Sequence, residues 1–221
     1  MQQLTFEMVF YPTYSRALQS FIGLEGVFLL RCESNGDTDL RFEIATKIDG
    51  QNDPRFRSQQ KMGSDRQENG KWYHIAIVYD GRKNSTQDAY QMYINGVKEK
   101  LTPAEDSYAD VAPNTYLNLS EVRGDEALMI GRSGNREDRL GYCNVAQARM
   151  WKTARTQEKI KEDMCKYYTP EEARANENLL GYWIPGNGIE TGTFKNYGFA
   201  GEELDAKVYT QGVNIFGTTV K

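Results

Sequence analysis

The chain has 221 residues, of which 39% are hydrophobic and 26% charged, so it can bury a core as one large β-sandwich or as two small domains. A formal net charge of −4 without a basic stripe excludes a typical nucleic-acid-binding protein. No apolar run approaches the roughly 20 residues that a membrane-spanning helix needs. The aromatic content of 12%, mostly Tyr and Phe, favours strands over helices.

Neither the N-terminus nor the cysteines assign a compartment. Residues 2–10 resemble a strand rather than a signal peptide, so the chain is either a processed piece of a longer exported protein or a cytoplasmic protein. Cys32, Cys143 and Cys165 show no C-x-x-C spacing. We interpret them as small buried thiols, with one disulfide and a leftover thiol as the alternative.

Alternating apolar and polar residues predict a series of short strands separated by turn residues. The predicted strands cover residues 4–10, 18–24, 27–32, 40–44, 73–79, 89–94, 128–130, 145–151 and 179–184. Glu25-Gly26 suits a tight hairpin, and Asn95-Gly96 is the dipeptide that best suits a type I′ turn. The strand around His74 is otherwise apolar on both faces, so we expect it to be central. Regular short strands of this kind are typical of a sandwich or barrel.

Helical signals occur only after residue 152. Residues 156–167 carry a one-sided apolar stripe. Thr169, followed by Pro and by Glu at the third helical position, forms a capping box for a second short helix that ends near Asn176. No internal repeat or linker is evident, so we expect one domain. This single sandwich domain covers residues 1–221. It includes a helical cap at 152–176 and a closing strand and tail at 177–221.

Four sequence blocks follow one another in a fixed order. They are residues 70–81 (GKWYHIAIVYDG), 93–96 (YING), 129–132 (MIGR) and 141–151 (GYCNVAQARMW). This order resembles the laminin-G-like, concanavalin-A-like jelly-roll modules, nearest to the bacterial, Bacteroides-type cell-surface versions, over residues 4–160. The resemblance implies an all-β fold: a two-sheet antiparallel jelly-roll β-sandwich with one or two short C-terminal helices. It also implies core positions for Trp72, Trp151 and Trp183.

We expect no enzymatic activity. His74 is the only histidine, and on an apolar strand we interpret it as a structural core residue, which leaves neither a metal cluster nor a Ser-His-Asp triad. Jelly-roll relatives that cleave β-glucans carry alternating carboxylates along one strand, and retaining chemistry needs two carboxyl groups about 5–5.5 Å apart. Glu43 instead stands alone between Arg41 and Ala45. A glycoside hydrolase is therefore the least favoured function.

Two polar segments, residues 47–71 and 102–126, are longer than turns require and are candidates for a binding site. The predicted ligand-binding residues are Phe56, Tyr108, Arg55, Arg57, Tyr14 and Tyr116. We expect Phe56 and Tyr108 to be the contact aromatics. Because calcium prefers oxygen ligands, Asp49, Asn52 and Asp53 form a candidate calcium site, although turn chemistry alone also explains this composition.

Two functions remain open at this point. The favoured one is a non-catalytic extracellular module that binds a glycan at the cell surface, as the resemblance implies. The alternative is a protein-interaction or structural accessory lipoprotein of an outer-membrane nutrient-uptake complex, with a cell-surface protein as its partner. Both place the chain outside the cell or on the outer-membrane surface.

Overall fold

The fold is built around β1 (Gln3–Pro12), a strand of 10 residues whose alternate side chains Leu4, Phe6, Met8 and Phe10 are buried. A computed structural model describes residues 1–14, 16–34, 40–46, 54–63, 70–104, 115–118, 128–132, 139–185 and 193–207. Because successive side chains of a strand point to opposite faces, this alternation places one face of β1 in the core.

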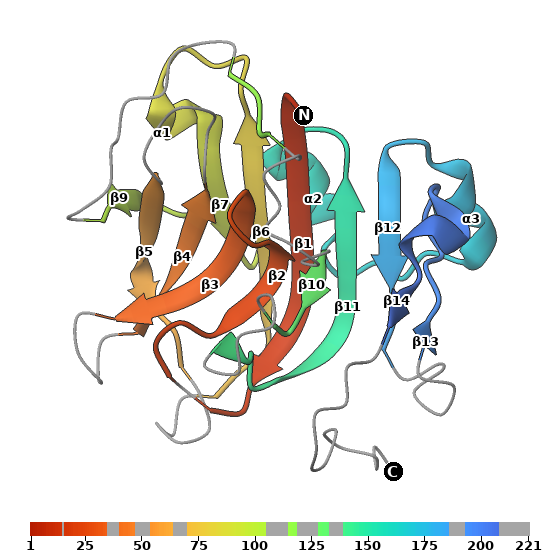
Figure 1. Ribbon diagram of the computed structural model, residues 1–221, viewed down its shortest axis with the longest axis horizontal. Coiled ribbons are helices and arrows are strands. Elements are labelled where there is room, and N and C mark those ends of the chain that lie inside the picture. Colours follow the sequence, from red (N-terminus) through yellow and green to blue (C-terminus); the bar gives the residue numbers. More distant parts are fainter. Residues whose placement is uncertain are drawn as a thin grey trace.

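Two antiparallel six-stranded sheets pack face to face (Figure 1). The first sheet has the order β12-β11-β1-β6-β7-β8 and the second the order β10-β2-β3-β4-β5-β9. In addition to β1, the first sheet contains β6 (Tyr73–Asp80), β7 (Tyr90–Ile94), β8 (Val97–Lys98), β11 (Cys143–Trp151) and β12 (Leu179–Trp183). The strands of the second sheet are β2 (Ser20–Leu24), β3 (Phe28–Ser34), β4 (Leu40–Thr46), β5 (Arg55–Lys61), β9 (Leu101–Pro103) and β10 (Met129–Ile130). The predicted jelly-roll sandwich is confirmed.

The core between the sheets is rich in aromatic rings. Phe10 of the first sheet stacks on Phe21 of the second at a centroid distance of 4.6 Å, and Tyr73 meets Phe42 edge to face at 5.1 Å. Such pairs add about 0.5–1.5 kcal/mol beyond the area they bury. The predicted hairpin between β7 and β8 is also present, since Asn95 and Gly96 both have the positive φ of a type I′ turn, at 52° and 74°.

In the described residues, three short α-helices accompany the sheets, namely α1 (Thr86–Ala89), α2 (Gln157–Asp163) and α3 (Pro170–Ala175), together with a 3-10 turn, η5 (Gly201–Leu204). The capping box of α3 is confirmed, because the Thr169 hydroxyl accepts from the Glu172 amide while the Glu172 carboxylate accepts from the Thr169 amide. The expectation that helices occur only after residue 152 is wrong for α1, a single turn that begins after Ser85. Among the described residues no helix is long and apolar enough to cross a membrane.

Helix α2 lies on the outer face of the first sheet, behind β1 in Figure 1 and opposite the second sheet. Its buried Ile160 packs on outward-facing Ala76, Val78 and Tyr93. The helix ends at Asp163, before the predicted residue 167. The C-terminal part continues the first sheet, because β12 pairs with β11, and it adds the small β13 (Thr193–Phe194) and β14 (Ala206–Lys207) pair.

The three cysteines carry free thiols. Cys32 is buried, as predicted, and burial raises its pKa. Cys143 is half-buried, and burial of its thiol raises its pKa to about 12. Cys165 is exposed, so its interpretation as a buried thiol is wrong: it follows the end of α2, where the chain has left the apolar face of the helix.

Candidate functional site

Trp72 is exposed on the outer face of the first sheet, with 52% of its surface accessible. The expected core position is therefore wrong for this residue, whereas Trp151 and Trp183 are buried as predicted, at 4% and 1%. The reason is alternation along β6: Tyr73 points into the core, so its neighbour Trp72 points out. Exposed apolar side chains mark a binding surface where they gather into a contiguous patch.

Tyr11 and Asn144 extend this surface across two further strands. The rings of Tyr11 and Trp72 have centroids 5.7 Å apart and are inclined by 58°. On the other side of β1, Tyr11 is the register partner of Asn144, whose side chain is exposed. We call Tyr11, Trp72 and Asn144 the platform: an indole, a phenol and an amide in a row across three neighbouring strands.

A second aromatic pair lies at the same end of the first sheet. Tyr14, one of the predicted ligand residues, meets Tyr142 edge to face at a centroid distance of 5.4 Å. The two rings follow the end of β1 and precede the start of β11, and the Thr13 amide donates to the Tyr142 carbonyl at 2.9 Å. Both tyrosines are half-buried. This end of the sheet therefore combines one predicted contact residue with the platform.

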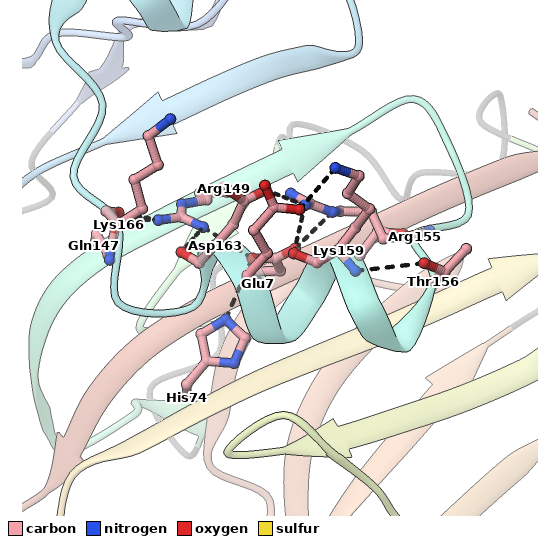
Figure 2. A network of polar contacts seen from close by, with 11 residues as sticks. Glu7, His74, Gln147, Arg149, Arg155, Thr156, Lys159, Asp163 and Lys166 are labelled. Atoms are coloured by element: carbon pink, nitrogen blue, oxygen red, sulfur yellow. Dashed lines mark hydrogen bonds and ion pairs between the residues drawn. The ribbon is translucent and has the colours of Figure 1, made fainter.

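Next to the platform, the outer face carries a buried polar cluster centred on Glu7 (Figure 2). Glu7 Oε2 lies 3.3 Å from His74 Nε2 and 3.2 Å from Arg149 Nη1, and Glu7 Oε1 lies 3.4 Å from Arg155 Nε. Arg155 also pairs with the Asp163 carboxylate. We call Glu7, His74, Arg149, Arg155 and Asp163 the polar clamp. His74 is 7% exposed, which confirms that it is buried.

The polar clamp fastens α2 and the residues after it to the sheet. Arg149 Nη1 donates to the Asp163 carbonyl at 2.9 Å, and its Nη2 donates to the Lys166 carbonyl. Arg155 Nη2 donates to the Lys159 carbonyl at 2.9 Å, so both arginines bind backbone carbonyls of α2 or of the residues that follow it. The two arginines balance the charges of the two carboxylates. The cluster is closed over by α2, which favours a structural role over a ligand site.

The carboxylates of the polar clamp have lowered pKa values. Burial by itself would raise the pKa of Glu7, but the hydrogen bond with His74 and the charges of Arg155 and Arg149 hold it below the ordinary 4.5. Burial likewise opposes ionisation of Asp163, and the hydrogen bond and charge of Arg155 lower its pKa below 3.8. Both groups are therefore ionised at neutral pH and stabilise the fold in that form.

We expect acid to destabilise the protein through these two carboxyls. A lowered folded-state pKa contributes stability that is present above the unfolded-state value and is lost as the pH falls through the folded-state value. Urea midpoints measured from about pH 7 down to about pH 3 should therefore fall below about pH 4.5. Glu7→Gln should flatten this dependence. Equal pH dependence in Glu7→Gln and the parent would contradict the assignment.

The other predicted ligand residues in the described part of the chain do not lie together in one site. Phe56 is 3% exposed and stacks on Tyr90 at 4.9 Å, so its prediction as a contact aromatic is wrong. It alternates with Arg55 and Arg57 along β5, which turns the ring into the core and the arginines outward. Tyr116 is 57% exposed, but the next residue, Leu117, pairs with Met1. Tyr116 thus lies at the start of β1 and Tyr14 beyond its end, roughly 30 Å away along the strand.

The two long polar segments are neighbours in the fold. β5 of the first segment pairs with β9 at the start of the second, in the register Arg57 to Thr102. The predicted site residues Tyr108, Asp49, Asn52 and Asp53 lie outside the described residues. Within the described part of the chain, no three His, Cys, Asp or Glu side chains gather closely enough to hold a metal ion.

A laminin-G-type family model, that of the concanavalin A-like lectin/glucanases superfamily, matches residues 1–161. The chain belongs to this superfamily. The resemblance read from its sequence blocks is thereby confirmed. No curated protein sequence matches the chain.

Three solved structures are similar to this superfamily member to different degrees. A candidate carbohydrate-binding protein from Bacteroides ovatus is similar with a TM-score of 0.65 and 22% identity, over 88% of this chain and 49% of that protein. This chain thus spans about half the length of the Bacteroides protein. A SAP-like pentraxin from Limulus polyphemus has a TM-score of 0.45 and 13% identity, over 72% of this chain and 68% of that one. Domain 4 of the arabinanase AbnA from Geobacillus stearothermophilus has a TM-score of 0.42 and 15% identity, over 75% and 67%.

The name of the superfamily includes glucanases, which use carboxyl groups in catalysis. The surroundings of Glu43, on the outer face of the second sheet, show whether it suits such a role. Glu43 is fully buried, and its Oε1 lies 2.6 Å from Arg31 Nη2 and 2.8 Å from Arg31 Nε. Its Oε2 accepts from Arg57 Nε at 2.8 Å. Both oxygens are therefore bound by guanidinium groups, which disfavours a nucleophile or proton donor. The predicted ligand residue Arg57 holds Glu43 in this arrangement.

Sequence reasoning missed the platform. The signal that could have found Trp72 was its position immediately before an apolar strand with an inward Tyr73, since alternation then turns the indole outward. Tyr11 could have been found in the same way, one residue after the buried Phe10. Asn144 carried no such signal, because its place beside Tyr11 depends on how β11 pairs with β1.

Proposed function

We propose that the chain is a non-catalytic carbohydrate-binding module and that the platform is its binding surface. The observation that supports this most is the exposed Trp72 ring beside Tyr11. The C–H face of a pyranose ring packs on an aromatic ring while its hydroxyl groups remain at the edge, near polar side chains such as Asn144. Binding surfaces of this kind combine an apolar base with a few well-placed polar groups.

The carboxylates agree with a binding role rather than with hydrolysis. Glu43 is held between two arginines and Glu7 is enclosed by the polar clamp. A retaining or inverting glycosidase needs one carboxyl that donates a proton and a second that acts on the sugar or on water. Glu7 and Glu43 are each held by guanidinium groups, which suits neither of these two catalytic roles.

A glycan array, run with and without calcium, tests the proposed function directly. The parent protein is expected to bind at least one class of glycan on the array. Binding that occurs only with calcium would favour the predicted calcium site at Asp49, Asn52 and Asp53. An array on which nothing binds under either condition would reject carbohydrate binding and favour the protein-partner alternative.

We expect Trp72→Ala to weaken the affinity for such a glycan about tenfold or more, which corresponds to at least about 1.4 kcal/mol. The loss combines the apolar contact and the stacking of the ring. Titration calorimetry of the parent and of the variant measures the change. The matched control is Tyr116→Ala, an exposed aromatic at the other end of β1. The opposite result, with Tyr116→Ala weakened and Trp72→Ala unchanged, would place the site at the 102–126 segment.

A further inference from the structure

The platform has the shape of a corner. The rings of Trp72 and Tyr11 are inclined by 58° with their centroids 5.7 Å apart, whereas a crystalline polysaccharide surface requires coplanar rings. Trp72 is the more exposed ring and supplies the floor, and half-buried Tyr11 supplies a wall beside it. The corner therefore suits a single sugar ring that carries an apolar substituent at its edge.

An amide lies beyond the wall. Asn144 is the register partner of Tyr11 on the side away from Trp72, and its exposed side chain makes no hydrogen bond to another described residue. Its carboxamide offers two donors and one acceptor. Two strand spacings separate Asn144 from Trp72, about 10 Å. A pyranose ring with an acetamido group at C2 is long enough to reach along this row, while an unsubstituted ring leaves the amide in water.

We propose that the platform recognises an N-acetylhexosamine residue of a glycan, an assignment that rests on the proposed carbohydrate-binding function. The sugar ring stacks on Trp72, and the methyl of the acetamido group packs on Tyr11. The carbonyl oxygen of the same group accepts from the Asn144 carboxamide. One substituent thus contacts both the apolar ring and the polar group beside it, which a hydroxyl at C2 does not.

The test uses two trisaccharides with the same β-1,4 backbone that differ only at C2, namely chitotriose and cellotriose. The parent protein is expected to bind chitotriose about tenfold more tightly, because a site that hydrogen-bonds one substituent discriminates against its absence. Asn144→Ala is expected to reduce this preference to about twofold. Its affinity for cellotriose should fall less than its affinity for chitotriose, because the C2 hydroxyl is shorter than the acetamido group, and its Tm should match that of the parent. Trp72→Ala should weaken the binding of both trisaccharides.

The outcomes separate this proposal from the proposed function. Equal affinities of the parent for the two trisaccharides would overturn it, and so would a preference that survives in Asn144→Ala. If neither trisaccharide binds while the array detects only glycans that lack an N-acetylhexosamine residue, the N-acetylhexosamine assignment fails and carbohydrate binding stands. If no glycan binds at all, the proposed function itself fails.

Discussion

Glu7→Ala is expected to lower the free energy of unfolding by about 3–5 kcal/mol, a large share of the roughly 5–15 kcal/mol that stabilises a typical domain. The reason is that Glu7 neutralises two buried guanidinium groups and accepts from buried His74. Removing its carboxylate leaves Arg149 and Arg155 charged, with fewer partners in a site closed to water. Urea denaturation at neutral pH measures the change.

The control for this prediction is an ion pair of the same chemistry on the surface. Lys159 and Glu162 are 2.7 Å apart on α2, and both side chains are 62% exposed. Glu162→Ala should change the free energy of unfolding by no more than about 0.5 kcal/mol, since solvent screens the pair. Comparable losses in Glu7→Ala and Glu162→Ala would show that burial of the polar clamp has no energetic consequence.

Phe56→Ala is expected to cost about 3–5 kcal/mol of stability, because the ring is buried between the sheets and its removal leaves a cavity. Thermal or urea unfolding measures the loss. The matched control is Tyr167→Ala, an aromatic that is 57% exposed and should change stability by no more than about 0.5 kcal/mol.

Phe56→Ala also distinguishes a loss of binding caused by unfolding from the loss of a direct contact with the glycan. At a temperature where Phe56→Ala is folded, its glycan affinity should equal that of the parent, since the ring faces away from solvent. A stable Phe56→Ala protein with weakened binding would restore the original interpretation of this residue as a contact aromatic. It would also contradict the placement of the site on the platform.

The burial of Phe56 shows that a local sequence pattern does not always determine where a side chain points. In the sequence, an aromatic between two arginines within a polar segment favoured a loop. The same alternation also fits a strand with one wet face, and pairing with β4 and β9 on either side decides for the strand. Charge near a residue describes the solvent-facing side of its strand and does not determine where its own side chain points.

The amino-acid sequence by itself determined the features that depend on near neighbours: nine strands of the two sheets, though not β5, β8 or β9, the type I′ turn at Asn95, and the capping box at Thr169. Each follows from alternation or backbone preference within a few residues. Only the tertiary structure decided the surface chemistry. The platform and the polar clamp join residues more than 60 positions apart, such as Tyr11 with Trp72 and Glu7 with Arg149. Strand register and the position of α2 set these contacts, and both arise from packing of the whole chain.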